Sequence, residues 1–271
     1  MPRRLLLSIA VAASVFLAAC GGSSSAPALT DPKDILTHSA SSLEGIKSVH
    51  VKAGLTGKVD PGSLTGSGTG AGATVDLTGS TLEGDIDIAK SEAKLAIAAP
   101  SLFNLSADII VDSGTLYLKS SLTGDKYQKL DLSTLTAGLP IPSLPATGSP
   151  DPSAAAAMID QLKAELDKLP APTKLADEKI GDVDCYHAQQ KVSSTDVPEA
   201  SGLPAGTVTL DIWSSKADYR PCRVGIAVDG GAQGTFGVTI DLTKYDAAVD
   251  ITAPPADQVS DQPFSIPGVT P

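Results

Sequence analysis

The sequence predicts an α+β fold, in which a strongly curved antiparallel β-sheet, shaped as a half-barrel, holds helices on its concave side. Two segments begin with the same Asp-Pro pair and carry apolar residues at helical spacing. Short segments with a hydrophobic period of two, separated by turn residues, predict about nine or ten antiparallel strands. Frequent Gly, Ala, Ser and Thr residues allow such a sheet to curl strongly.

Each expected helix begins at an Asp-Pro pair, because Asp caps a helix N-terminus and Pro fits the first helical position. The first begins at Asp31 and ends near Gly45, and five of its residues share one face: Ile35, Leu36, Ser39, Leu43 and Ile46. The second begins at Asp151 and ends before Pro170, with an apolar stripe of Ile159, Leu162, Leu166 and Leu169. If both helices lie on the concave side, these stripes face the sheet.

The strands follow from the alternation of apolar and polar residues. They are expected at 49–59, 82–88, 94–99, 105–111 and 115–119 in the first half, and at 173–180, 183–192, 207–213, 223–228 and 235–242 in the second. Asp112-Ser113-Gly114 joins two of them and is typical of a tight hairpin. The glycine-rich stretch 61–73 and the proline-rich stretch 140–152 are expected to be loops.

One set of strand residues is expected to face the concave side, because their apolar side chains alternate with polar ones. The set is Leu82, Ile86, Ile88, Leu95, Ile97, Leu116, Leu118, Val208, Leu210, Ile212, Val224, Ile226 and Val228. These aliphatic residues suit a packed core and an open cavity for alkyl chains equally well. From the residues alone, both interpretations stay open.

Composition and motif spacing argue against several function classes. A formal net charge of −11 without a basic stripe argues against nucleic-acid binding, and an aromatic content of 4% disfavours a shallow sugar site. His38, His50 and His187 are scattered, so neither a metal nor a cofactor is expected. Ser91 and Lys94 match the serine-acylating S-x-x-K motif, but they join two strands instead of sharing a helical turn. We therefore expect no catalytic residue and no enzymatic activity.

Residues 1–19 have the features of a secretory signal peptide: Arg3 and Arg4, a short apolar stretch and small residues at its end. About fifteen apolar residues are too few to span a bilayer as a helix. The segment Leu17-Ala18-Ala19-Cys20 resembles the lipobox of bacterial lipoproteins. This resemblance implies cleavage before Cys20 and attachment of a diacylglyceryl group, with acyl chains such as palmitate, to that cysteine. An ordinary cleavable signal with a chance cysteine is the alternative.

The other two cysteines are expected to pair with each other. With Cys20 acylated, Cys185 and Cys222 remain, an even number in an oxidising envelope compartment. A zinc site would need further ligands, and only His187 lies nearby in the sequence. A disulfide is therefore expected, with two buried free thiols as the alternative.

Several motifs, taken in chain order, resemble the LppX/LprA/LprF/LprG-type lipoproteins of mycobacteria. The lipobox and the early helix are followed by Leu116-Tyr117-Leu118, by Tyr127-Gln128-Lys129-Leu130-Asp131-Leu132, by residues 180–187 (IGDVDCYH) and by Asp211-Ile212-Trp213. The resemblance implies a LolA/LolB-like half-barrel. It also implies a hydrophobic cavity for the acyl chains of a lipid or glycolipid, which such proteins carry across the cell envelope.

Together these observations give an expected domain organisation: a signal peptide at 1–19, a lipidated flexible tether at 20–30, a lipid-binding half-barrel domain at 31–252 and a Pro-rich C-terminal tail at 253–271. The protein is expected as a monomer on the extracytoplasmic face of the cell membrane, anchored through Cys20. Its expected partner is an acylated lipid or glycolipid, a membrane transporter is a further candidate, and no nucleic acid is expected. The alternative is a structural or regulatory lipoprotein with a filled core that acts through a protein partner.

Overall fold

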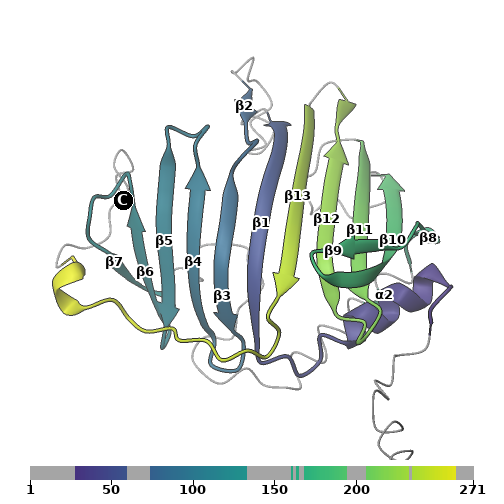
Figure 1. Ribbon diagram of the computed structural model, residues 1–271. Helices are drawn as coiled ribbons and strands as arrows, with labels where there is room; N and C mark the ends of the chain where they lie inside the picture. The colour runs from purple at the N-terminus through teal and green to yellow at the C-terminus, as the bar shows by residue number, and fades with distance from the viewer. Residues whose placement is uncertain are drawn as a thin grey trace, which may run out of the picture.

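The computed structural model describes residues 28–59, 74–132, 168–193, 206–231 and 234–260, together with residues 160, 163 and 164. An antiparallel sheet of thirteen strands dominates this part of the chain, and the helix α2 (Pro32–Ser41) accompanies it (Figure 1). Within the same ranges, no helix is both long enough and apolar enough to cross a membrane. The predicted α+β class with an open, curved antiparallel sheet is confirmed.

The strands agree closely with the expected segments. In chain order they are β1 (Ser48–Val59), β2 (Val75–Asp76), β3 (Thr81–Asp87), β4 (Glu92–Ala99), β5 (Leu105–Asp112), β6 (Thr115–Ser120), β7 (Gln128–Asp131), β8 (Thr173–Lys174), β9 (Glu178–Ile180), β10 (Val183–Ser193), β11 (Thr207–Ser215), β12 (Pro221–Asp229) and β13 (Gly234–Thr243). They outnumber the expected nine or ten, partly because the segment 173–180 forms two strands. The chain leaves the sheet between them, where Asp177 forms ion pairs with Lys174 and Lys216.

The first and last long strands meet in the middle of the sheet. The strand order is β7-β6-β5-β4-β3-β1-β13-β12-β11-β10-β8, with β2 beside β1 and β9 beside β10. Strand β1 pairs with β3 on one side and with β13 on the other (Figure 1). The sheet therefore consists of two meanders, and long-range pairing between β1 and β13 joins them.

The predicted hairpin between β5 and β6 is confirmed. Asp112 and Thr115 form its last pair, and the two residues between them, Ser113 and Gly114, have φ angles of 49° and 75°. Positive φ at both central positions is typical of a type I′ turn, whose twist matches that of the flanking strands.

Helix α2 begins as the sequence predicts. Asp31 Oδ1 accepts a hydrogen bond from the Lys33 N–H (2.8 Å), and Pro32 occupies the first helical position. The helix ends at Ser41, before the expected end near Gly45. Beyond it the backbone hydrogen bonds span three residues instead of four, from the Leu43 N–H to the Ala40 carbonyl oxygen (3.2 Å) and from the Glu44 N–H to that of Ser41 (3.1 Å), and the chain turns at Gly45, whose φ is 75°.

The apolar side of α2 packs on one end of the sheet. Ile35 and Leu36 are buried against Tyr186 and Ala188 of β10, and Ile212 of β11 packs against the same cluster. Burial of these side chains, rather than helix propensity, stabilises a helix of ten residues, which would be marginal in isolation. The expected contact between the helix stripe and the sheet is therefore present for α2.

The second expected helix, from Asp151 to Pro170, lies mostly outside the described residues. Residues 160, 163 and 164 of it are helical. Lys163 forms an ion pair with Glu44 (Nζ to Oε1, 3.2 Å), just after α2. The signal segment, Cys20 and the stretches 61–73 and 140–152 also lie outside the described ranges.

The segment after β13 runs along one end of the sheet to β7 (Figure 1, yellow). Ile251 is buried with Ile110 of β5 and Tyr127. The Tyr127 N–H donates to the carbonyl oxygen of Gln258 (2.8 Å), and the Ser260 N–H donates to that of Tyr127 (2.8 Å). The segment includes a short 3₁₀ helix, η4 (Ala256–Gln258), and is bound to the sheet up to residue 260.

Candidate functional site

The strand register brings expected inward-facing residues from both meanders onto one face of the sheet. Residues paired directly across neighbouring antiparallel strands have their side chains on the same face. Leu82 of β3 is paired with Ala53 of β1, which is paired with Ile240 of β13. Ile240 is paired with Val224 of β12, and Val224 is paired with Ile212 of β11. One apolar row therefore crosses five strands without interruption.

Twelve of the thirteen expected residues lie on this face: Leu82, Ile86, Leu95, Ile97, Leu116, Leu118, Val208, Leu210, Ile212, Val224, Ile226 and Val228. Ile88 does not, because β3 ends at Asp87 and Ile88 lies in the following turn with 37% of its surface exposed. The Asp87 carboxylate accepts the N–H of Lys90 (3.0 Å) and stabilises that turn. Ile88 is therefore at the end of the sheet, which corrects the expected strand end.

The face also carries residues that were not among the expected ones, mainly on the central strands. They include Val51, Ala53 and Leu55 of β1, Ile109 and Val111 of β5, and Phe236, Val238, Ile240 and Leu242 of β13. Both central strands were predicted, and their apolar residues alternate in the same way, so the signal was present in the sequence. We term these residues and the twelve above the apolar face.

Most side chains of the apolar face are half-buried. Val228 is buried, at 4% exposure, whereas Ile226 is 37% exposed. Helix α2 packs on the end formed by β10 and β11, through Ile35 and Leu36. A broad apolar surface that is only half-buried is suited to contact with a further apolar group.

Two glycines bring neighbouring strands unusually close together. A Cβ atom added to Gly84 of β3 would lie 2.0 Å from the carbonyl oxygen of Lys94 and 2.8 Å from the Cα of Leu95. Gly57 of β1 has a φ of 98°, and a Cβ there would lie 2.1 Å from the carbonyl oxygen of Thr235. Such glycines permit tight bends in a sheet, so they favour its strong curvature.

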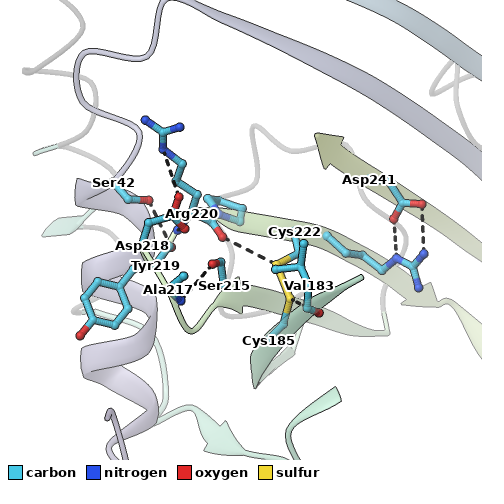
Figure 2. Close-up of a disulfide and its surroundings, with 12 residues drawn as sticks. Ser42, Val183, Cys185, Ser215, Ala217, Asp218, Tyr219, Arg220, Cys222 and Asp241 are labelled. Carbon is cyan, nitrogen blue, oxygen red and sulfur yellow. Dashed lines mark hydrogen bonds and ion pairs between the residues drawn. A yellow bond between two sulfur atoms is a disulfide. The ribbon is translucent and has the colours of Figure 1, made fainter. Parts of the chain in front are cut away.

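The opposite face of the sheet carries ion pairs across its strands, and an apolar cluster on β5 where Ile251 covers Ile110. Arg223 of β12 donates two hydrogen bonds to Asp241 of β13, which raise the pKa of the guanidinium (Figure 2). Lys52 of β1 bonds Glu83 of β3 (3.2 Å) and holds the pKa of that carboxyl below its usual value. Around β1, β3, β12 and β13 the sheet therefore separates an apolar surface from a charged one.

A buried histidine joins three strands on the polar face. His187 of β10 is 5% exposed, with Nδ1 3.1 Å from Glu178 of β9 and Nε2 2.8 Å from Asp211 of β11. Its ring stacks on Trp213, with the ring centroids 4.1 Å apart. Trp213 thus lies on the same face as His187 and Arg223, opposite the apolar face. Among the described residues, no group of three or more His, Cys, Asp or Glu side chains could hold a metal ion.

Cys185 of β10 and Cys222 of β12 form a disulfide (Figure 2). Both residues are buried. Strand β11 lies between their strands, and its pairing with β12 is irregular at Ser214, close to Cys222. The disulfide expected from the cysteine count is confirmed, and it links three consecutive strands of the second meander. Cys20, the expected lipidation site, lies outside the described residues, so its acylation stays a prediction.

No protein-family model and no curated protein matches this chain. Among solved structures, the lipoprotein LppX of Mycobacterium tuberculosis is similar over 82% of this chain and 98% of its own, with 14% identity and a TM-score of 0.51. LprF of Mycobacterium bovis is similar over 82% of this chain and 96% of its own, with 18% identity and a TM-score of 0.51. A LolA superfamily protein of Nitrosomonas europaea aligns over 86% of this chain and 99% of its own, with 10% identity. Its TM-score of 0.27 is too low to indicate a shared fold. The chain therefore shares the fold of LppX and LprF, which confirms the resemblance at the level of the fold.

Proposed function

We propose that this chain is a membrane-anchored cell-envelope lipoprotein that binds the acyl chains of a lipid or glycolipid on its apolar face and carries that lipid across the envelope. The observation that carries the proposal is the continuity of the apolar face over both meanders. The fold shared with LppX, which is described as a lipoprotein, supports it.

Binding of this kind follows from the hydrophobic effect alone. Each CH₂ group that leaves water contributes about 0.8 kcal/mol, so an acyl chain laid across the rows of Leu, Ile and Val side chains needs no directed bond. No covalent bond is made or broken, and no catalytic residue is required. The lipid headgroup remains at the edge of the face, where polar groups and water can solvate it.

The proposed carrier is anchored at its N-terminus. Residues 1–19 are the signal peptide, Cys20 bears the lipid, 20–30 form the tether, and 31–252 form the lipid-binding domain on the extracytoplasmic side of the cell membrane. The chain enters the domain beside β10, where the Leu29 N–H donates to the Tyr186 hydroxyl (3.1 Å). The proposed unit is a monomer that takes one acylated lipid, and a membrane transporter is its candidate protein partner.

Native mass spectrometry of the purified protein, without added detergent, tests this function. We expect a mass in excess of the anchored chain that corresponds to a non-covalently bound lipid. A matched pair of variants locates the binding surface: Leu95→Asn changes the apolar face, and Ala96→Asn makes a similar change at the next residue, which faces the other side. Leu95→Asn should lower lipid occupancy severalfold, because it introduces an amide into the acyl contact, whereas Ala96→Asn should not.

Circular dichroism of both variants checks that the sheet has formed. An unliganded native protein that also takes up no fluorescent acyl probe would contradict the proposed function. Equal lipid occupancy in the two variants would contradict the assignment of the binding surface.

A further inference from the structure

Two turns at one end of the sheet expose large apolar side chains. Phe103, in the turn between β4 and β5, is 98% exposed, and Leu122, in the turn between β6 and β7, is 64% exposed. Strands β4 and β6 both flank β5 and run in the same direction, so the two turns lie at the same end (Figure 1). The second turn is also bonded to the start of β5, directly after the first turn: the Ser121 N–H donates to the carbonyl oxygen of Ser106 (2.9 Å), and the Ser106 N–H donates to Ser121 Oγ (3.2 Å). We term Phe103 and Leu122 the apolar tip.

The turn that carries Phe103 is held in an unusual conformation. Phe103 and Asn104 have φ angles of 57° and 54°, which bulky L-residues rarely adopt. Two backbone hydrogen bonds stabilise this turn. The Leu102 N–H donates to the carbonyl oxygen of Ala99 (3.0 Å), and the Asn104 N–H donates to that of Pro100 (3.1 Å). The aromatic ring is therefore presented to solvent by an ordered turn, and such strained conformations concentrate at functional positions.

The two turns differ in charge from the rest of the chain. The turn at 100–104 (PSLFN) contains no charged side chain, and the turn at 121–127 (SLTGDKY) carries one acid and one base, Asp125 and Lys126, so neither turn has a net charge, whereas the whole chain has a net charge of −11. An acidic protein is repelled by anionic lipid headgroups, and turns without net charge reduce that repulsion where they approach the membrane. Phe and Leu are among the side chains that interfacial segments insert at the boundary between headgroups and acyl chains.

We propose that the apolar tip inserts into the interface of a lipid bilayer. This inference rests on the proposed function only in that a lipid carrier must meet a membrane in order to load or release its cargo. A lipid surface fits better than a protein partner, because two side chains offer far less than the roughly 800 Å² that each partner buries in a standard protein interface. The same area argument disfavours a stable contact with a second copy of this chain.

The proposed anchor and the apolar tip can reach one bilayer. Helix α2, near the start of the described chain, lies toward the other end of the strands (Figure 1). The eight residues of β4 span about 27 Å. The residues from Cys20 to Ala28 can extend over a comparable distance, about 30 Å. A molecule anchored at Cys20 can therefore turn the tip toward the membrane that holds it.

Tryptophan fluorescence of the full chain, as processed by its host and reconstituted in phosphatidylcholine vesicles, tests the proposal. Trp213 is the one tryptophan of the sequence. Trp213→Phe combined with Phe103→Trp therefore places a single reporter at the tip. Trp213→Phe combined with Val183→Trp is the matched control, because Val183 is also exposed (44%) but begins β10 at the opposite end of the strands. We expect phosphatidylcholine with brominated acyl chains to quench the fluorescence at position 103 at least twofold more strongly than at position 183.

Vesicle binding by a second set of variants gives an independent measurement. In a chain that begins at residue 21, and so lacks both the apolar signal segment and the lipid anchor, Phe103→Ser with Leu122→Ser should weaken vesicle binding about tenfold, since each buried apolar side chain contributes to affinity, while Val183→Ser should not. Equal quenching at positions 103 and 183 would overturn the proposal, as would unchanged binding by the serine variants. Fluorescence of the Phe103→Trp reporter that is blue-shifted but unquenched would indicate a second copy of the chain and would also overturn it. Lipid occupancy by native mass spectrometry is read separately, so loss of tip insertion is distinguishable from failure of the proposed function.

Discussion

At the scale of single residues, Asp246 shows how one side chain joins distant parts of the sheet. It follows β13, and its Oδ1 accepts the N–H of Lys47 (2.8 Å), just before β1. Its Oδ2 accepts a hydrogen bond from Arg220 Nη2 (2.6 Å), and its own N–H donates to the carbonyl oxygen of Ser48 (2.9 Å). The Lys47 N–H, followed by Arg220, lowers the pKa of the Asp246 carboxyl in the folded state.

We expect Asp246→Asn to lower the free energy of unfolding at neutral pH, by at most about 1 kcal/mol, because water screens this partly exposed site. A carboxyl with a depressed pKa stabilises the fold above its unfolded pKa, near 4, and loses that contribution as the pH falls through its folded pKa. The difference between wild type and variant should therefore shrink below about pH 4. Urea unfolding at pH 7 and pH 3 measures it, with Asp250→Asn as a control for lost surface charge. A difference that grows on acidification would contradict this role.

Single polar residues were the part of the candidate site least accessible to sequence reasoning. Asp87 alternates with apolar residues at the end of β3, yet it is 7% exposed and accepts the N–H of Lys90 in the next turn. His187 looked isolated in the sequence, and only the pairing of β9, β10 and β11 brings Glu178 and Asp211 to its two ring nitrogens. Such contacts depend on register between strands, which no local pattern specifies.

At the scale of elements, the contact between β3 and β4 at Gly84 tests how the sheet bends. We expect Gly84→Ala to destabilise the protein by about 1–3 kcal/mol, because the new Cβ would collide with the backbone of Lys94 and Leu95, which cannot rotate away. Gly54→Ala in β1 is the matched control. No heavy atom lies within 4 Å of its added Cβ, and alanine restricts the unfolded chain, so its stability should be unchanged or slightly raised.

Thermal and urea unfolding of the two alanine variants measure this difference. Equal stability would mean that close approach at Gly84 does not shape the sheet. Because Gly84 lies between residues of the apolar face, the same variant should also reduce lipid uptake if the curvature of that face matters for binding.

Most elements could be predicted, because each has a local cause. Asp31 and Pro32 specify the start of α2, Ser113 and Gly114 specify a hairpin, and alternation specifies both the strands and their apolar side. The central pairing of β1 with β13 could not be predicted, since it joins opposite ends of the sequence. The docking of Ile251 on Ile110 was missed for the same reason: an extended segment without periodicity acquires its structure only from the surface it covers.

At the scale of the whole molecule, the sheet keeps two incompatible surfaces apart. On one face, ion pairs such as that of Arg223 with Asp241 join neighbouring strands. On the other face, rows of aliphatic side chains extend over both meanders. A net charge of −11 favours solubility while the apolar face stays available for a ligand. Exposure of an apolar face of this extent to water raises the free energy of the folded state. The proposed lipid should lower that free energy when it binds.

We therefore expect removal of the bound lipid to destabilise the protein and its return to restore stability. A ligand at one hundred times its dissociation constant stabilises the native state by about 2.7 kcal/mol, which for a chain of this size corresponds to a rise in melting temperature of roughly 5–10 °C. Protein delipidated by organic extraction and refolding should melt lower by that amount, and titration with an acyl lipid should raise the melting temperature in proportion to occupancy. Leu95→Asn should show a smaller response, and Ala96→Asn should respond like wild type. If the delipidated and reloaded proteins melted at the same temperature, the apolar face would already be fully covered by the chain itself, and the structural or regulatory alternative would replace lipid carriage.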